Sequence, residues 1–132
     1  MAKTAVKTRA AKTVKTPAKK KLLVADLALG RSGDKGDVSN VGLLALDEAK
    51  YNLLVKTVTP QSLRKYFGDW VQGEIAVYPL PNIHALEIVL RKGLGGGATR
   101  TLRIDQTGKA MCEIVRRMEV EVSAAEAKKA GL

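Results

Sequence analysis

Two glycine-containing segments of the sequence hold residue types that can bind small anions. The first runs from Arg31 through Ser32 to Asp37 and continues to Asn40, directly after an apolar run. Glycines at positions 33 and 36 let successive backbone N–H groups converge into an anion-binding nest, to which Lys35 adds a positive charge. This chemistry suits a carboxylate or a phosphate ligand.

The acidic residues Asp34 and Asp37 leave two other interpretations of the first segment open. Two carboxylates could hold a cation, but their spacing does not match a calcium loop, which needs acidic or amide residues at alternate positions and a distant Glu. We therefore expect no metal. Alternatively, the carboxylates bond neighbouring N–H groups in a tight strand-to-strand turn.

The second segment is the glycine run that ends with Gly95, Gly96 and Gly97. Nucleotide-binding glycine loops follow a strand and open a helix, whereas this run is predicted to follow a helix and lead into a strand. It therefore offers a surface without side chains, which a ligand or another subunit can approach closely. Arg100, just beyond it, is a candidate for anion contact.

His84 and Cys112 are the only residues of their types, which limits the chemistry available. A single histidine excludes a pair of histidine metal ligands within the chain, and a single cysteine excludes an internal disulfide. We expect a surface histidine, a buried thiol and a reducing, cytoplasmic location. The sequence contains no complete catalytic set, so whether the chain is an enzyme stays open, and we expect no cofactor.

The positive charge of the chain is concentrated at its N-terminus. The 132 residues carry a formal charge of +10, but eight basic residues and no acidic ones lie within 1–21, which leaves 15 basic against 13 acidic residues elsewhere. We expect 1–21 to be a disordered basic tail, because it has too little apolar surface to offset the entropy of ordering. The remainder has the length of a single domain, and no apolar run is long enough for a membrane helix.

Short apolar runs in the first half predict strands over 22–29 and 41–46. Asp47 is suited to cap a helix that extends to about residue 56. Thr59 caps a second helix, with Pro60 at its first position. This helix places Leu63, Tyr66, Phe67 and Trp70 on one face, which we expect to be core.

The second half begins with a predicted strand over 75–80, followed by Asn82 as the cap of a helix over 83–92. Alternating residues predict a half-buried strand over 98–104 and a turn over 105–108. A short helix over 110–118 and a strand over 118–122 follow, with a frayed polar tail over 123–132. The sum is an α+β sandwich whose helices cover one face of a mainly antiparallel or mixed sheet of four or five strands.

The order of several motifs in residues 22–122 resembles the small AtuA-like domain of acyclic terpene utilisation proteins. The motifs are Leu27 to Asp37, Asn40-Val41-Gly42, Leu80-Pro81-Asn82, Gly93 to Gly97, Leu102 to Asp105 and Gly108-Lys109-Ala110. The resemblance implies a ferredoxin-like α+β fold in a stand-alone form of the domain. It also implies bacterial catabolism of branched, terpenoid or other acyl-CoA-linked acids, together with a larger AtuA-type partner.

The leading hypothesis is therefore a small subunit of a catabolic enzyme complex in which the two glycine-containing segments share a site or interface. We expect an acyl-CoA or carboxylate ligand, with Lys35 and Arg100 in anion contact and Asp34 and Asp37 in positioning roles. The predicted ligand or interface residues are Arg31, Ser32, Asp34, Lys35, Asp37, Asn40, Asn82, Gly95, Gly96, Gly97 and Arg100.

Two alternatives remain from the sequence. The chain could be a structural or regulatory interaction domain without an active site, including a homo-oligomer. It could also associate with nucleic acid through its Lys-rich arm, which is less favoured because the sequence offers few aromatic residues that could stack on bases. No membrane partner is expected.

Overall fold

The structure is a computed structural model that describes residues 14–132. We predicted a disordered tail over 1–21, and the part of that prediction that concerns residues 1–13 lies outside the described residues. It is wrong for residues 19–21, which belong to strand β1 (Lys19–Leu23). This strand pairs with β6 (Glu119–Ser123), and Lys19 and Lys21 form ion pairs with Glu121 and Glu119 across the two strands.

The larger sheet has four antiparallel strands in the order β2-β3-β5-β4. These are β2 (Ala28–Lys35), β3 (Val38–Ala45), β4 (Ile75–Leu80) and β5 (Ala85–Leu90). In the central strands, Val41 of β3 lies opposite Ser32 of β2 and Ile88 of β5. Two hairpins, β2–β3 and β4–β5, are thus joined through β3 and β5.

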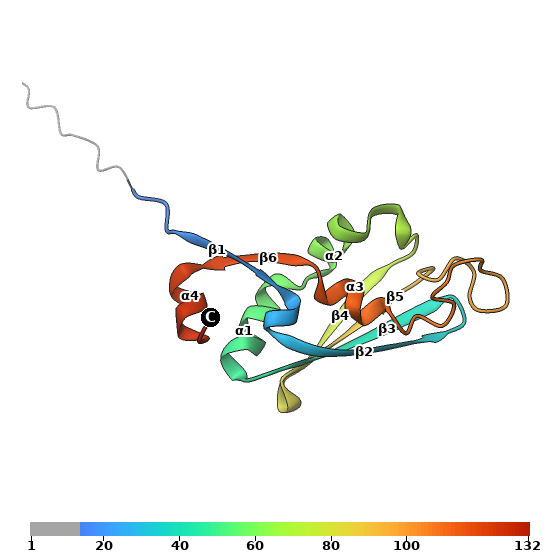
Figure 1. Cartoon of the computed structure of the whole chain (residues 1–132), viewed down its shortest axis with the longest axis horizontal. Coiled ribbons are helices and arrows are strands. Elements are labelled where there is room, and N and C mark those ends of the chain that lie inside the picture. Colours follow the sequence, from blue (N-terminus) through green and yellow to red (C-terminus); the bar gives the residue numbers. More distant parts are fainter. Residues whose placement is uncertain (1–13) are drawn as a thin grey trace, which may run out of the picture.

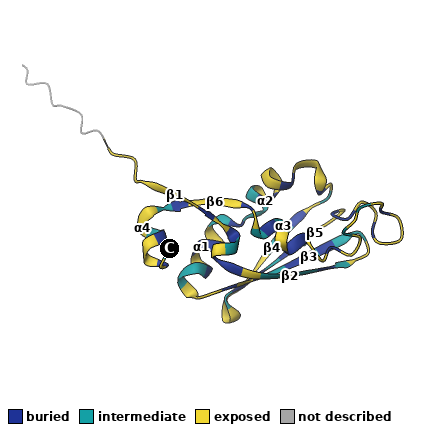
Figure 2. Ribbon diagram, viewed as in Figure 1, coloured by how far each residue is buried: buried dark blue, intermediate teal, exposed yellow. Residues whose placement is uncertain are grey.

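Three helices cover one face of this sheet (Figure 1). They are α1 (Glu48–Thr57), α2 (Pro60–Phe67) and α3 (Met111–Arg116). Successive side chains of a strand point to opposite faces of the sheet, so every second residue directs an apolar side chain toward the helices. The core between the two layers is fully buried (Figure 2) and includes Leu43, Leu54, Leu63, Leu86, Ile88 and Val115. Within residues 14–132, no helix covers the opposite face of the sheet.

The two-stranded sheet of β1 and β6 forms an outer layer over α1 (Figure 1). Val120 and Val122 of β6 are buried beneath it. Helix α4 (Ala124–Lys129) follows β6 directly, and Ala127 and Ala130 are buried against the core.

Local capping signals in the first half of the sequence are confirmed. The carboxylate of Asp47 accepts a hydrogen bond from Lys50 N at 2.8 Å at the start of α1. The Thr59 hydroxyl accepts one from Ser62 N at 3.1 Å, with Pro60 as the first residue of α2. The expected α+β class, with helices on one face of an antiparallel sheet, is also confirmed.

The predicted helix over 83–92, capped by Asn82, is wrong, because this segment forms strand β5. Leu86, Ile88 and Leu90 recur with period two and are buried, whereas Glu87 and Val89 point to the other face. A short apolar run satisfies helical and strand periods equally well, and pairing on both sides in the centre of the sheet favours the strand.

The predicted strand over 98–104 is also wrong, since this segment is a loop and Leu102 and Ile104 are fully exposed. The apolar run at 22–29 is divided between two sheets by a short turn at Val24–Asp26. In the charged segment that follows, Arg31 to Lys35 belong to β2, Gly36 and Asp37 form the turn, and Asn40 belongs to β3.

Two further expectations about burial fail. The frayed tail expected over 123–132 instead contains α4, because Ser123 and Glu126 form a capping box and two alanines reach the core. Of the face that α2 was expected to bury, Leu63 and Phe67 are buried, whereas Tyr66 and Trp70 are exposed.

Within residues 14–132, no helix has the length and apolar character needed to cross a lipid bilayer.

Glu126 connects α4 to α1 and provides a test of this packing. Its carboxylate accepts hydrogen bonds from the Lys56 ammonium and from the backbone and hydroxyl groups of Ser123. These bonds, chiefly the one from Lys56, lower the pKa of Glu126 from 4.5 to about 2.

A group with a lowered native pKa stabilises the fold above its unfolded pKa, and this contribution disappears as pH falls through the native value. Glu126→Gln should therefore destabilise the protein above pH 4.5, and the difference from the wild type should vanish as pH falls toward 2. Urea unfolding across this range measures the effect. Glu48→Gln, which removes a carboxylate outside the ion pairs of residues 14–132, is the control. An unchanged difference between pH 4.5 and 2 would contradict the role of Glu126.

Candidate functional site

The two glycine-containing segments singled out in the sequence lie in contact at one end of the sheet. Asp37 occupies the turn between β2 and β3, and its Oδ1 accepts hydrogen bonds from Leu94 N at 3.1 Å and Gly96 N at 2.8 Å. Its carbonyl oxygen accepts a further bond from Gly93 N at 3.0 Å. The N–H groups of the glycine run thus hold a carboxylate of the protein itself.

Position 97 requires glycine because the backbone of the loop lies very close to the backbone of the hairpin turn there. A Cβ atom there would lie 2.9 Å from the carbonyl carbon and oxygen of Gly36, and the φ angle of Gly97 is +91°. Asp37, Gly96 and Gly97 therefore fasten the loop after β5 to the β2–β3 hairpin, whereas Gly95 lies against Thr101 and Arg103 within the loop itself. We assign structural roles to these four predicted residues.

A charged cavity of about 380 Å³ lies beside this contact, on the sheet face opposite α1, α2 and α3. Five of its lining residues were predicted from the sequence, namely Arg31, Ser32, Asp34, Lys35 and Asn40. Glu87 and Lys109 complete its polar lining, and Gly33 and Gly42 contribute bare backbone.

The cavity carries an excess of positive charge. Arg31, Lys35 and Lys109 form no ion pair with another residue of 14–132. The carboxylate of Glu87 is oriented by Asn40, whose Nδ2 donates a hydrogen bond to it at 3.2 Å. Three cations that face only two carboxylates, Asp34 and Glu87, leave the cavity suited to an anionic group.

Bare backbone allows two charged side chains to lie close to the sheet. A Cβ on Gly33 would lie 3.2 Å from Lys109 Nζ, and one on Gly42 would lie 3.3 Å from Glu87 Oε2. Ser32 fixes the segment that carries Lys109, because its hydroxyl donates to Lys109 O at 3.1 Å and accepts from Cys112 N at 3.0 Å. The cavity is thus built jointly by the hairpin, β5 and the loop before α3.

An apolar cavity of about 570 Å³ continues from the charged one along the same face. Arg31, Gly42 and Glu87 line both cavities. The apolar lining includes Leu29, Leu44, Leu80 and Ile83, whose exposed fractions lie between 41% and 60%. We call the two connected cavities the sheet-face groove.

Two predicted site residues lie outside the charged cavity and the turn contact. Asn82 is exposed in the turn Pro81–Ile83 between β4 and β5, where only its neighbour Ile83 lines the groove. Arg100 is exposed in the loop after β5 and packs along Gly96.

Sequence reasoning missed Glu87, Lys109 and the apolar half of the groove. The signal for Glu87 was the alternation of 86–90, which places it on the outward face once the segment is read as a strand. The position of Lys109 depends on the path of the long loop between β5 and α3, where the alternation over 98–104 predicted a strand that the structure does not form.

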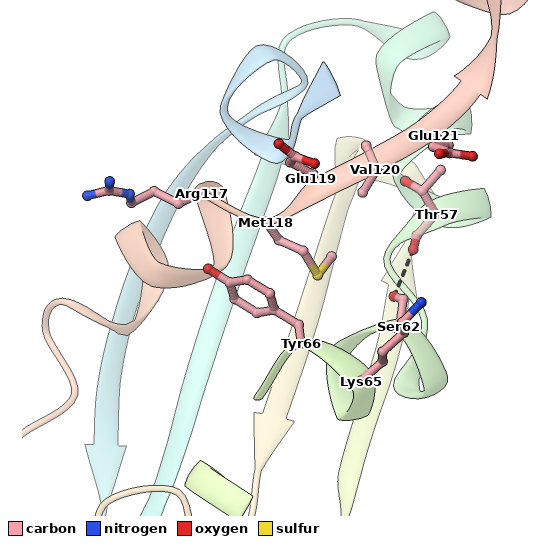
Figure 3. A pocket seen from close by; sticks show the side chains of 9 residues that line it. All are labelled: Thr57, Ser62, Lys65, Tyr66, Arg117, Met118, Glu119, Val120 and Glu121. Carbon is pink, nitrogen blue, oxygen red and sulfur yellow. Dashed lines mark hydrogen bonds between the residues drawn. The ribbon is translucent and has the colours of Figure 1, made fainter. Parts of the chain in front are cut away.

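A further cavity, of about 590 Å³, lies between α2 and β6 (Figure 3). Its hydroxyl groups already make internal bonds: Ser62 Oγ donates to Thr57 O at 2.8 Å and Tyr66 Oη donates to Ile114 O at 2.8 Å. These bonds join α1, α2 and α3, and none of the residues predicted for the site lines this cavity. We therefore assign it a structural role.

The described part of the chain contains no group of three or more His, Cys, Asp or Glu side chains placed to hold a metal ion.

Helices on one face of the sheet and a charged, partly apolar groove on the other define a small ferredoxin-like α+β domain. The family model of the AtuA ferredoxin-like domain matches residues 22–121, and the chain belongs to this family. Comparison with curated proteins and with solved structures gives no match.

The role of Asp37 can be tested by Asp37→Ala. Loss of its carboxylate removes two charge-assisted hydrogen bonds from the loop, and we expect the free energy of unfolding to fall by about 1.5–3 kcal/mol. Amide hydrogen exchange at Leu94 and Gly96 should accelerate. Asp34→Ala is the control, because the Asp34 carboxylate makes no hydrogen bond within residues 14–132. Equal effects of the two variants would refute the assigned role.

The close approach at Gly97 gives a second test. Gly36→Ala places a methyl group in open space at a φ of +62°, so it should cost only the roughly 1–2 kcal/mol of a left-handed conformation. Gly97→Ala should cost more, because the backbone of the hairpin turn has to move away. Thermal unfolding of both variants measures the difference, and a Gly97→Ala protein as stable as Gly36→Ala would contradict the contact.

Proposed function

We propose that this protein is the small subunit of a bacterial catabolic enzyme complex that acts on branched, terpenoid or other acyl-CoA-linked acids with a larger AtuA-type partner. The observation that carries the proposal is the sheet-face groove, in which a cationic cavity opens into an apolar one. Such a groove is complementary to a ligand with an anionic head and a hydrocarbon tail.

The arrangement of the strands gives this ligand a direction. The head group would lie near Lys35 and Lys109, and the tail would lie over Leu29, Leu44 and Leu80. The interval from residue 29 to residue 35 in β2 corresponds to roughly 20 Å of extended strand, which is long enough for a branched acyl chain with its head group.

The groove supports binding rather than a complete reaction. Among the residues that line it in the described part of the chain there is no histidine, cysteine or tyrosine. The ring of His84 packs on Tyr51, with their centroids 5.4 Å apart, and Cys112 is buried. Under this proposal the larger partner contributes the reacting groups, and this subunit holds the acyl ligand.

Ligand binding by the isolated protein tests the first half of the proposal. Isothermal titration with branched carboxylic acids of increasing chain length should give affinities that rise by up to roughly fourfold for each added methylene, because each buried CH₂ contributes about 0.8 kcal/mol. The double variant Lys35→Met with Lys109→Met should bind at least roughly tenfold more weakly, because the carboxylate loses both ammonium groups.

Lys65→Met removes a lysine from the cavity between α2 and β6 and serves as the matched control, for which we expect unchanged affinity. Affinities that are independent of chain length, or equal in the control and the double variant, would refute ligand binding in the groove. Mixing the protein with the larger AtuA-type protein tests the second half. If both stay monomeric and show no joint turnover of acyl-CoA esters, the subunit assignment is wrong.

A further inference from the structure

The loop between β5 and α3 contains a short irregular segment, with bends at Arg103 and Ile104, whose polar side chains face the protein and whose aliphatic side chains face water. Thr101 is 7% exposed and Arg103 is half-buried, whereas Leu102 is 101% exposed and Ile104 is 104% exposed. We call residues 101–105 the inverted segment. It lies in the loop that extends beyond the hairpin end of the sheet (Figure 1).

The polar side of the inverted segment is fixed to the body of the protein. Thr101 N donates to Gly97 O at 2.8 Å, and the Thr101 hydroxyl accepts a bond from Arg103 N at 3.1 Å. The Arg103 guanidinium lies 4.3 Å from the centre of the Trp70 ring and donates to Gly93 O at 2.9 Å. The Asp105 carboxylate accepts a bond from Ala110 N at 3.1 Å.

These attachments hold the two aliphatic side chains in water. Leu102 and Ile104 cannot turn inward while Thr101 and Arg103 occupy the inner side. Their backbone N–H and C=O groups also make no hydrogen bond within residues 14–132. A pair of fully exposed aliphatic side chains, on a segment whose polar side is bonded to the body of the protein, offers anchors to another chain.

We propose that the inverted segment is the element that docks this subunit on its larger AtuA-type partner, by inserting Leu102 and Ile104 into an apolar cleft bordered by carboxylates. The inference rests on the proposed function and identifies the surface used. We infer carboxylates around the partner's cleft from the charges beside the segment. Arg100 and Lys109 flank it in the sequence and form no ion pair within residues 14–132, whereas the Asp105 carboxylate is bound to backbone.

A second copy of the chain fits this surface less well. A symmetric contact between two inverted segments would gather Arg100 and Lys109 of both copies. Like charges brought together across an interface disfavour it.

Docking at this segment would also place the partner beside the ligand head group. The same loop carries Lys109, which lines the charged cavity, and the glycine run that is bonded to Asp37. The partner would therefore approach the groove from its cationic end, where the acid or thioester group of the ligand would lie.

The test compares two double variants of the full chain in binding to the larger AtuA-type protein. Leu102→Ser with Ile104→Ser should weaken binding at least roughly 100-fold, because two buried aliphatic anchors are lost. Leu46→Ser with Val55→Ser, which removes two exposed aliphatic side chains elsewhere, should change the affinity by less than about twofold. Because Leu102 and Ile104 are fully exposed, the first variant should unfold at the wild-type temperature and keep its affinity for branched acids.

Each remaining outcome overturns the inference in a distinguishable way. If the wild type forms the complex and Leu102→Ser with Ile104→Ser binds equally well, the docking surface lies elsewhere and the proposed function stands. If the wild type does not bind the larger protein, the subunit assignment fails together with the docking surface. If sedimentation of the wild type alone reveals a dimer that the first variant abolishes, the occupant is a second copy.

Discussion

The hydrogen bonds from the N–H groups of Leu94 and Gly96 to the Asp37 carboxylate are the constraint on which the hairpin end of this domain depends. The chain between β5 and α3 has no regular secondary structure, so its path is determined by a few contacts with the sheet. Asp37 fixes the beginning of this loop and Ser32 fixes its end, through Lys109 O and Cys112 N. Between these two attachments lie the inverted segment and the lysine of the charged cavity, and both would lose their positions if the loop were released.

The features that could be predicted from the sequence are those decided within a few residues. The starts of α1 and α2 could be predicted from Asp47, Thr59 and Pro60, because a helix cap depends only on residues next to it in the sequence. Segment 83–92 could not be assigned in this way, since its apolar residues fit either period and the choice is made by pairing of β5 with β3 and β4. Segment 98–104 shows a different limit, because alternation reveals that a segment has two faces without revealing which one is turned inward.

The same distinction between local and long-range contacts separates the parts of the site that the sequence predicted from those that it missed. The charges of the β2–β3 hairpin do gather around one cavity, because neighbouring residues of a hairpin remain neighbours in space. Asp37 and the glycine run do meet, but they satisfy one another instead of presenting free N–H groups. Glu87 and the leucines of the groove belong to strands distant in sequence, and only the order β2-β3-β5-β4 brings them together.

Because positions 33 and 42 carry no side chain, the distance of two charged groups from the sheet depends on a single carbon atom at each position. Since the Lys109 ammonium and the Glu87 carboxylate lie within 3.2 and 3.3 Å of where a methyl group would stand, adding one carbon atom would lift either charge by a few tenths of an ångström. Strand pairing would be untouched, because β2 and β3 bond through their main chains. Under the proposed function, a single small substitution at either position would change the size of head group that the groove accepts, with no change of architecture.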